Sequence, residues 1–340
     1  MRLLLPALLL LGLAVSVSAQ RSASISDEAI LGSKMPARLS EFGFFGDGAG
    51  GPSSELIGYN LRTPLFSDYA EKQRFIYLPK GQAVQVAEPS GKMIFPVGTA
   101  IIKSFGYDNG AGGLKILETR ILLHRGDGWI ALPYVWRADG RDADLKLGGM
   151  RLPISFTRPG GESQTISYAV PNKNQCKQCH SSNDRVEPIG PILGNMEFVS
   201  EAAKTRLLQG SGYTGRPVMP FARWDDPGGA SLNDRAAAYL FVNCAHCHRP
   251  TGSASNSGLY FDRGDHSSAN LGINKRPVAA GRGSGGFDFV IAPGRPGRSI
   301  LIHRMNSLEP DVAMPEVGRA SVHAEGLALL SEWINAMPAQ

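Results

Sequence analysis

The chain has 340 residues and a formal net charge of +5. A balance this mild gives no case for nucleic-acid binding, which requires a strongly basic face. The length is enough for two domains that each have a hydrophobic core.

The first residues have the pattern of a secretory signal peptide. Arg2 precedes an apolar run that ends near Val17, and Ser18 and Ala19 supply the small residues of a cleavage site. The run is short for a membrane span, so we expect cleavage after Ala19, which lowers the charge to +4; the alternative is an uncleaved anchor. No later stretch is apolar for long enough to cross a bilayer. The sequence therefore predicts a periplasmic or secreted protein with no membrane span after signal cleavage.

The next part of the chain predicts a lead-in arm and then a β-rich region. Residues 20–60 are rich in glycine and serine and form the predicted arm. Short apolar runs separated by turn residues follow, and this spacing is typical of antiparallel strands and hairpins. The predicted strands are 74–78, 95–105, 119–123, 129–136 and 164–170.

The pattern becomes helical after Arg223. Ser231 can cap a helix that leads into Cys244, and Ser299 can cap a second, shorter one. Apolar residues at three- and four-residue spacings between Leu327 and Met337 predict a closing helix. We therefore expect a β-rich domain over 61–225 and a second domain over 226–340.

All four cysteines lie in two copies of one pentapeptide, CKQCH at 176–180 and CAHCH at 244–248. C-x-x-C-H is the signature of covalent c-type haem attachment. Two thiols on one helical turn can each add to a haem vinyl group, and the histidine that follows becomes the proximal iron ligand. The competing interpretations are disulfides or a zinc site, neither of which explains a histidine after both pairs. The sequence thus predicts two covalently bound haem c groups, bound by Cys176, Cys179, Cys244 and Cys247, with His180 and His248 on the irons.

The segment from about 230 to 340 resembles a class I cytochrome c domain, with a helix entering the motif, a methionine loop and a closing helix. The resemblance implies His248 as proximal ligand and Met314, 66 residues later, as the ligand on the opposite face. Such ligation favours electron transfer over catalysis. His303 and His323 are the alternatives to Met314. The glycine- and arginine-rich stretch between His248 and Ser299 departs from the family pattern.

The first motif has a different setting, because only 50 residues separate His180 from Ser231. Strands followed by C-x-x-C-H resemble the β-fold family of lysine-cross-linked hydroxylamine-oxidising cytochromes and β-type cytochromes c′. The matching stretches are 95–103 and 126–129, followed by the motif at 176–180.

The β-fold resemblance implies His180 as proximal ligand, with an opposite face that is open to a small molecule. Lys103 is then the residue to examine for a haem cross-link, the alternative being a surface lysine on a strand. A closed site would instead use Met219, which lies in a proline-flanked loop like that of Met314, or Met196. Pro191 resembles the class I proline whose carbonyl holds the proximal histidine, and it is expected to orient His180.

These observations predict an α+β fold class: an N-terminal antiparallel β-rich domain that carries one c-haem motif, and a C-terminal all-α class I cytochrome c domain. The whole chain resembles an uncharacterised group of secreted bacterial proteins. The predicted function is electron transfer by an exported dihaem c-type cytochrome. The alternative is a small-molecule redox enzyme or gas-binding protein with an open first haem and a relay second haem.

We expect a redox partner protein, and a stretch with an excess of positive charge is a candidate contact for an acidic partner or for haem propionates. A solvated loop explains the same charges. This basic stretch contains a single acidic residue, Asp288. Its basic residues are Lys275, Arg276, Arg282, Arg295, Arg298 and Arg304.

Two other classes of protein are less compatible with the pattern. Dihaem peroxidases also carry two such motifs, but their domains are helical and their motifs lie further apart than the 68 residues between Cys176 and Cys244. The other class is a scaffold protein whose β-domain docks on another secreted enzyme, and the sequence pattern does not exclude it.

Overall fold

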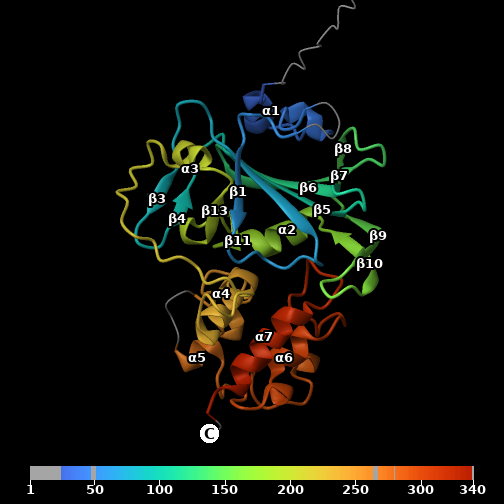
Figure 1. Cartoon of the computed structure of the whole chain (residues 1–340), viewed down its shortest axis with the longest axis vertical. Helices are drawn as coiled ribbons and strands as arrows, with labels where there is room; N and C mark the ends of the chain where they lie inside the picture. Colours follow the sequence, from blue (N-terminus) through green and yellow to red (C-terminus); the bar gives the residue numbers. More distant parts are fainter. Residues whose placement is uncertain (1–23, 47–50, 263–266, 279, 339–340) are drawn as a thin grey trace, which may run out of the picture.

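A computed structural model describes residues 24–46, 51–262, 267–278 and 280–338. The predicted signal peptide at 1–19 lies outside these residues. Within these ranges, no helix is both long enough and apolar enough to cross a bilayer. The strands gather in one part of the molecule and the helices α4 to α7 in the other (Figure 1).

The main element is a seven-stranded antiparallel sheet with the strand order β13-β1-β2-β5-β6-β7-β8. Strands overlap all five segments for which the sequence predicts them. The hairpin β9–β10 and two smaller strand pairs complete the β-structure. The bounds in the main sheet are β1 Ile57–Leu61, β2 Glu71–Tyr77, β5 Ala100–Asp108, β6 Leu114–Arg125, β7 Gly128–Trp136, β8 Ala143–Leu145 and β13 Met196–Phe198. The remaining strands are β3 Gln85–Ala87, β4 Lys92–Ile94, β9 Met150–Thr157, β10 Ser163–Val170, β11 Ser181–Ser182 and β12 Arg185–Val186.

One face of the sheet is covered by the segment that precedes it. This segment forms α1 (Asp27–Leu31) and a 3₁₀ turn (Leu39–Phe42), and its Ile30, Phe42 and Phe44 are fully buried. They pack against strand residues such as Ile102 and Tyr134. Each such side chain contributes roughly 1.5–3 kcal/mol of burial free energy. The stretch predicted as a lead-in arm thus supplies part of the core.

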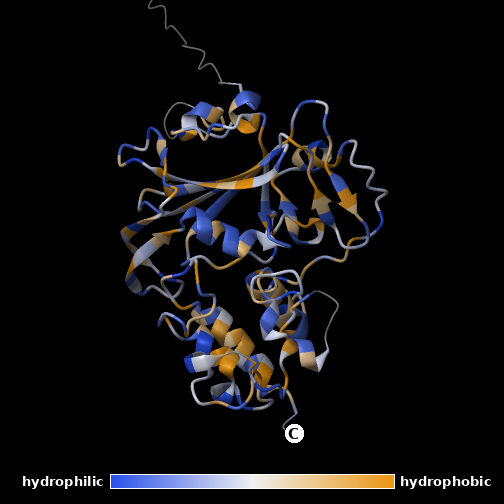
Figure 2. Cartoon of the chain, turned by 180° about the vertical axis from the view of Figure 1, so that it is seen from behind, coloured by the Kyte–Doolittle hydropathy of each residue, from blue (hydrophilic) through white to orange (hydrophobic). Residues whose placement is uncertain are grey.

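The other face of the sheet carries α2 (Lys173–His180) (Figure 1). Alternate residues of the strands point to this side, and Ile76, Ile101 and Leu122 form an apolar cluster there that includes Cys176 of α2. Helix α2 itself is mostly hydrophilic (Figure 2), and Cys176 is its one buried residue. The first motif is therefore held against the sheet through its first cysteine.

Helices dominate after residue 200, and they are α3 Glu201–Leu208, α4 Leu232–Cys244, α5 Ser268–Leu271, α6 Ile300–Met305 and α7 Ala324–Asn335. Helices α4 and α7 pack together through buried Tyr239, Leu240, Leu330 and Ile334. The structure thus has helices at all three places where the sequence predicts them. Ser231 caps α4 by accepting a hydrogen bond from the Asp234 N–H, whereas the Ser299 side chain makes no capping bond to α6.

The predicted fold class is nevertheless wrong. The described residues are mostly β-structure with mostly short helices, and the C-terminal part is not an all-α class I cytochrome c domain. Helices α5 and α6 have four and six residues, and irregular chain joins them. The physical reason is the glycine-rich stretch after the second motif, where Gly258, Gly272 and Gly285 take left-handed φ values that end helical turns.

The two parts of the molecule are joined by a buried carboxylate. Asp68, 2% exposed, lies between β1 and β2. Its carboxylate accepts hydrogen bonds from the N–H groups of Ala320 and Ser321 and from the Ser321 hydroxyl, all at 2.8–2.9 Å. Nearby, the Phe66 ring stacks on His323 with 4.2 Å between centroids. These contacts fix the C-terminal part against the sheet.

Replacing Asp68 with alanine should lower the free energy of unfolding by about 3 kcal/mol, because the buried N–H and hydroxyl of Ser321 and the half-buried N–H of Ala320 lose their acceptor. The measurement is urea denaturation followed by circular dichroism. The control is Asp225→Ala, since Asp225 is exposed. Equal stability of the two variants would show that the carboxylate does not hold the two parts together.

Candidate functional site

The first motif is positioned by a capping box at the start of α2. The Asn172 side chain accepts from the Gln175 N–H at 2.9 Å, and the Gln175 side chain accepts from the Asn172 N–H at 3.0 Å. This reciprocal pair fixes the first turn of the helix, so Cys176 and Cys179 lie three residues apart on neighbouring positions of one face. The helix ends at His180, because Ser181 is extended and begins β11.

The second motif is positioned by the end of α4. Cys244 is the last residue of the helix, and its carbonyl accepts from the N–H groups of Cys247 at 3.1 Å and His248 at 2.9 Å. The chain therefore makes a further tight turn through the motif, which holds its two cysteines and His248 together.

The two motifs meet in space. One ligand atom each of Cys179, His246 and Cys247 lie within 4.8 Å of one another. The segments that follow the motifs also touch: the Asn183 N–H donates to the Thr251 carbonyl at 3.3 Å, and the Ser182 hydroxyl donates to the Thr251 hydroxyl at 3.2 Å. The second cysteines of the two motifs are thus neighbours, although 68 positions separate them in the sequence.

His180 is oriented by a backbone carbonyl. Its Nδ1 lies 2.9 Å from the carbonyl oxygen of Glu187. A carbonyl only accepts, so Nδ1 carries the proton and Nε2 keeps its lone pair, which is the arrangement found in metal-ligating histidines. The expectation that the Pro191 carbonyl does this is wrong. Strand β11 pairs with β12, and this short hairpin brings Glu187 rather than Pro191 back to the histidine.

His248 is oriented by a serine. Its Nδ1 lies 3.0 Å from the Ser257 hydroxyl oxygen, and that hydroxyl donates its own proton to the Ala254 carbonyl at 2.7 Å. The hydroxyl must therefore accept from His248, so Nδ1 carries the proton and Nε2 keeps the lone pair. Both histidines of the motifs offer the same nitrogen to a metal.

Both imidazoles are neutral at neutral pH. Burial lowers the pKa of His180 to about 3, against an opposing hydrogen bond to the Glu187 carbonyl. Burial likewise lowers the pKa of His248 to about 4. A neutral imidazole is the form that ligates a metal.

The four thiols of the motifs differ in their pKa values. Burial raises the pKa of Cys176 and raises that of Cys244 to about 12. The hydrogen bond to Cys247 and burial both raise the pKa of Cys179. The pKa of Cys247 is instead lowered to about 3, first by its hydrogen bond with Cys179 and further by His246 and Ser253. A lowered pKa is typical of a reactive or metal-ligating thiol, so Cys247 differs from the other three cysteines.

Met314 lies in a loop held by Arg304. The Arg304 guanidinium donates to the Val312 carbonyl at 2.8 Å, and the Met314 N–H donates to the Arg304 carbonyl at 3.0 Å. The charge of Arg304 also contributes to lowering the pKa of His248. Arg304 thus lies near both predicted ligands of the second site.

The other sulfur and nitrogen candidates lie in different settings. Met196 is buried in the apolar cluster that contains Cys176, whereas Met219 is 73% exposed and borders a cavity. His323 stacks on Phe66, and its Nδ1 lies 2.9 Å from the Tyr239 hydroxyl. His303 packs edge-on against a phenylalanine ring. The packing of His323 at the joint makes it the less suitable substitute for Met314.

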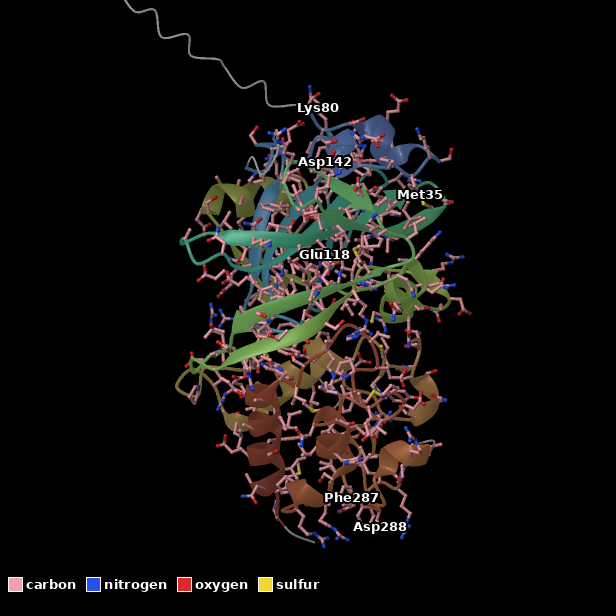
Figure 3. The ribbon with its side chains drawn as sticks, turned by 90° about the vertical axis from the view of Figure 1, so that its right-hand side faces the viewer. Met35, Lys80, Glu118, Asp142, Phe287 and Asp288 are labelled. Carbon is pink, nitrogen blue, oxygen red and sulfur yellow. The ribbon has the colours of Figure 1, made fainter. Side chains whose placement is uncertain are left out.

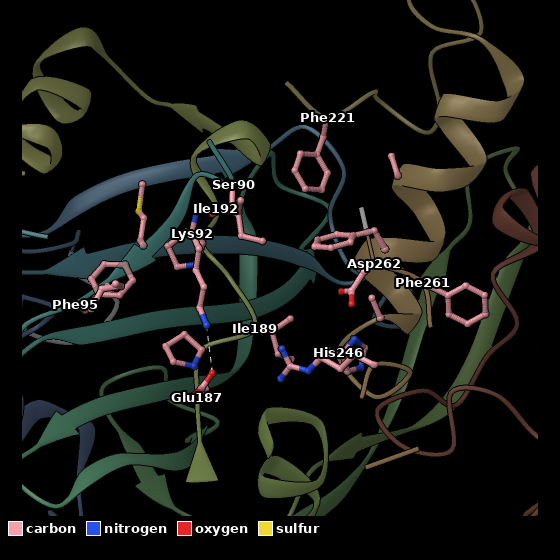
Figure 4. Close-up of a pocket in the computed structure, with 18 of the residues that line it drawn as sticks. Ser90, Lys92, Phe95, Glu187, Ile189, Ile192, Phe221, His246, Phe261 and Asp262 are labelled. Carbon is pink, nitrogen blue, oxygen red and sulfur yellow. Dashed lines mark hydrogen bonds and ion pairs between the residues drawn. The ribbon is translucent and has the colours of Figure 1, made fainter. Parts of the chain in front are cut away.

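A cavity of about 1810 Å³ lies between the sheet and α4. Phe95 and the ion pair of Lys92 with Glu187, 3.5 Å apart, line one side, and His246 and Asp262 line the other (Figure 4). This volume exceeds the roughly 300–1,000 Å³ of ordinary small-ligand pockets. Glu187, whose carbonyl orients His180, also lines this cavity.

The donors present fit a covalently held haem at each motif: two thiols on one helical turn, and a neutral imidazole whose Nε2 keeps its lone pair. A zinc ion on Cys179, His246 and Cys247 is the competing occupant, because thiolate and imidazole are zinc ligands. The two uses exclude each other, since a sulfur in a thioether is no longer a thiolate. The Nδ1 of His246 is buried without a partner among the described residues.

Comparison of the chain with known protein families, with curated proteins and with solved structures finds no match. The site must therefore be interpreted from its own residues. Sequence reasoning did not identify Glu187, Ser257 or the contact between the motifs. Nothing in the sequence marks these residues as partners, because hairpin geometry and the packing of distant segments bring them into place.

Proposed function

We propose that this chain is an exported dihaem c-type cytochrome that transfers electrons to a partner protein. It would carry two covalently bound haem c groups, one on Cys176 and Cys179 and the other on Cys244 and Cys247. His180 and His248 would be the proximal ligands.

The observation that carries the proposal is that the two motifs are adjacent and each histidine has its Nδ1 proton held by an acceptor. A pair of chance motifs has no reason to share this hydrogen bonding. A bound haem c supplies a one-electron couple whose potential is set by its axial ligands and surroundings. The close approach of Cys179 and Cys247 supports passage of electrons between the two sites.

This chain's own residues supply the rest of such a carrier. The Glu187 carbonyl and the Ser257 hydroxyl orient the imidazoles and raise their basicity. Arg304 holds the loop of Met314, the proposed second ligand at His248, and Met219 is the proposed second ligand at His180.

The proposed partner is a protein with an acidic face. Several arginines of the basic stretch are exposed. They are Arg276, Arg282, Arg295 and Arg298. Arg276 pairs with Asp288, and Arg298 lies over the ring of Phe287; both partners are labelled in Figure 3. A periplasmic or secreted location is proposed from the apolar N-terminal run of the sequence.

The first test is a haem count on the purified chain, expressed with its N-terminal segment in a host that attaches haem c. A pyridine haemochrome assay should give two haems per chain, and Cys176→Ala/Cys179→Ala and Cys244→Ala/Cys247→Ala should each give one. Elemental analysis in the same sample separates iron from zinc. Zinc at one per chain with no haem would overturn the proposal and favour a metal site at Cys179, His246 and Cys247.

Replacing Met314 with alanine should remove the sulfur-to-iron band of one haem and lower its midpoint potential by on the order of 100 mV, because a thioether ligand raises the potential. Spectroelectrochemistry measures both. Met150→Ala is the matched control, since Met150 is 42% exposed on β9. An unchanged spectrum in Met314→Ala would show that Met314 is not the second iron ligand.

The alternative function has an open first haem that acts on a small molecule. The cavity beside the chain that orients His180 favours it. The closed-site proposal predicts that the reduced wild-type protein does not bind carbon monoxide, and that Met219→Ala binds it at one haem. Carbon monoxide binding by the wild type at one haem would favour the enzyme or gas-binding function instead.

A further inference from the structure

The sheet face against which the first motif packs carries four cations. Arg74 on β2, Lys103 on β5 and Arg120 on β6 lie side by side, because Arg74 pairs in register with Lys103 and Lys103 with Arg120. Lys72 lies two residues from Arg74 and faces the same way. We call this set, Lys72, Arg74, Lys103 and Arg120, the cationic face.

The one carboxylate on this face is already fully engaged. Glu118 is completely buried (labelled in Figure 3). It accepts from Arg120 Nε at 3.0 Å and Nη2 at 2.5 Å, and from the Tyr168 hydroxyl at 2.6 Å. Its charge therefore balances Arg120 and leaves three cations.

The remaining three have no carboxylate partner. Arg74 is 8% exposed, and its guanidinium donates to the Lys72 carbonyl at 3.2 Å. Lys103 Nζ lies 5.1 Å from the centre of the Phe105 ring. Among the described residues, no acid lies within salt-bridge distance of Lys72, Arg74 or Lys103. Asp68, whose charge acts on Lys72, is committed to the loop at 320–321.

Arg74 is buried, and Lys72 and Lys103 are half-buried. Cations removed from water without a counter-charge are unfavourable, so the arrangement has an electrostatic cost that an anion would offset. The pKa values of both lysines are lowered, as expected when the charged form is unfavourable. Burial, followed by the charges of Arg120 and Arg74, lowers the pKa of Lys103 to about 7. Burial, followed by the charges of Arg74, Lys103 and Arg120, lowers the pKa of Lys72 well below its ordinary value.

The cationic face lies next to the first motif. The charges of Lys103 and Arg120 act on Cys176, Cys179 and His180, all on α2. A negative group here would therefore lie beside the residues that hold the first haem in the proposed function.

We propose that the cationic face is an anion site that binds a carboxylate or a small oxyanion beside the first motif. Two sources share this chemistry: the propionate side chain of a haem held at Cys176 and Cys179, and a free oxyanion that acts as substrate or effector. The first source rests on the proposed function, and the second does not require it.

The test uses the full chain as purified and two measurements. Isothermal titration calorimetry with sodium sulfate measures binding of a free oxyanion, and spectroelectrochemistry measures both haem potentials. Lys103→Met removes the charge and keeps much of the volume, and Lys103→Arg restores the charge. Lys115→Met is the control, because Lys115 is exposed on β6, the strand that carries Arg120.

A free oxyanion is the source if the wild type binds sulfate at one site and Lys103→Met weakens binding at least tenfold, while Lys103→Arg and Lys115→Met bind as the wild type does. A propionate is the source if sulfate does not bind and Lys103→Met lowers one haem potential that Lys103→Arg restores. The proposal is overturned if Lys103→Met matches Lys115→Met in both measurements.

Arg74→Gln gives an independent check in the same assays, with circular dichroism to establish that it folds. If Arg74→Gln does not fold, the comparison of Lys103→Met with Lys103→Arg tests the anion site by itself. A wild-type chain that carries no haem would refute the proposed function, and sulfate binding would then decide the anion site alone.

Discussion

The position of α2 between the sheet and the C-terminal helices determines the arrangement of both motifs. This helix is short and mostly polar, so its own apolar surface does not hold it in place. Cys176 anchors it in the apolar cluster of the sheet, and the hydrogen bonds to Thr251 connect the segment after it to the second motif. The adjacency of Cys179 and Cys247, and with it the case for two communicating haems, depends on these contacts.

Buried charge distinguishes this sheet from an ordinary one. The face that carries α1 is apolar, with Ile102, Ile121 and Tyr134 in its core. The face that carries α2 combines an apolar cluster with four cations and one carboxylate. A face built only for stability would use apolar residues, because unpaired buried charge costs free energy. This contrast between the two faces is the basis of the anion site proposed beside the first motif.

The second motif shows how local signals can be right while the domain they suggest is wrong. Helices occur after Ser231, after Ser299 and at the C-terminus, as the sequence indicates. These helices do not add up to an all-α class I cytochrome c domain, because left-handed glycines such as Gly272 and Gly285 break the chain between them. Glycine content marks such a stretch, but which glycines take positive φ depends on the tertiary contacts around them.

The sequence by itself determined the elements whose causes are local. These are the alternating runs that became strands, the serine cap of α4 and the two C-x-x-C-H motifs with their candidate ligands. Only the tertiary structure decided which distant groups meet: Glu187 with His180, Ser257 with His248, Cys179 with Cys247, and the three strands that line up Arg74, Lys103 and Arg120. The physical reason is that hydrogen bonding within a turn depends on neighbours in sequence, whereas strand register and the packing of the two parts depend on burial across the whole chain.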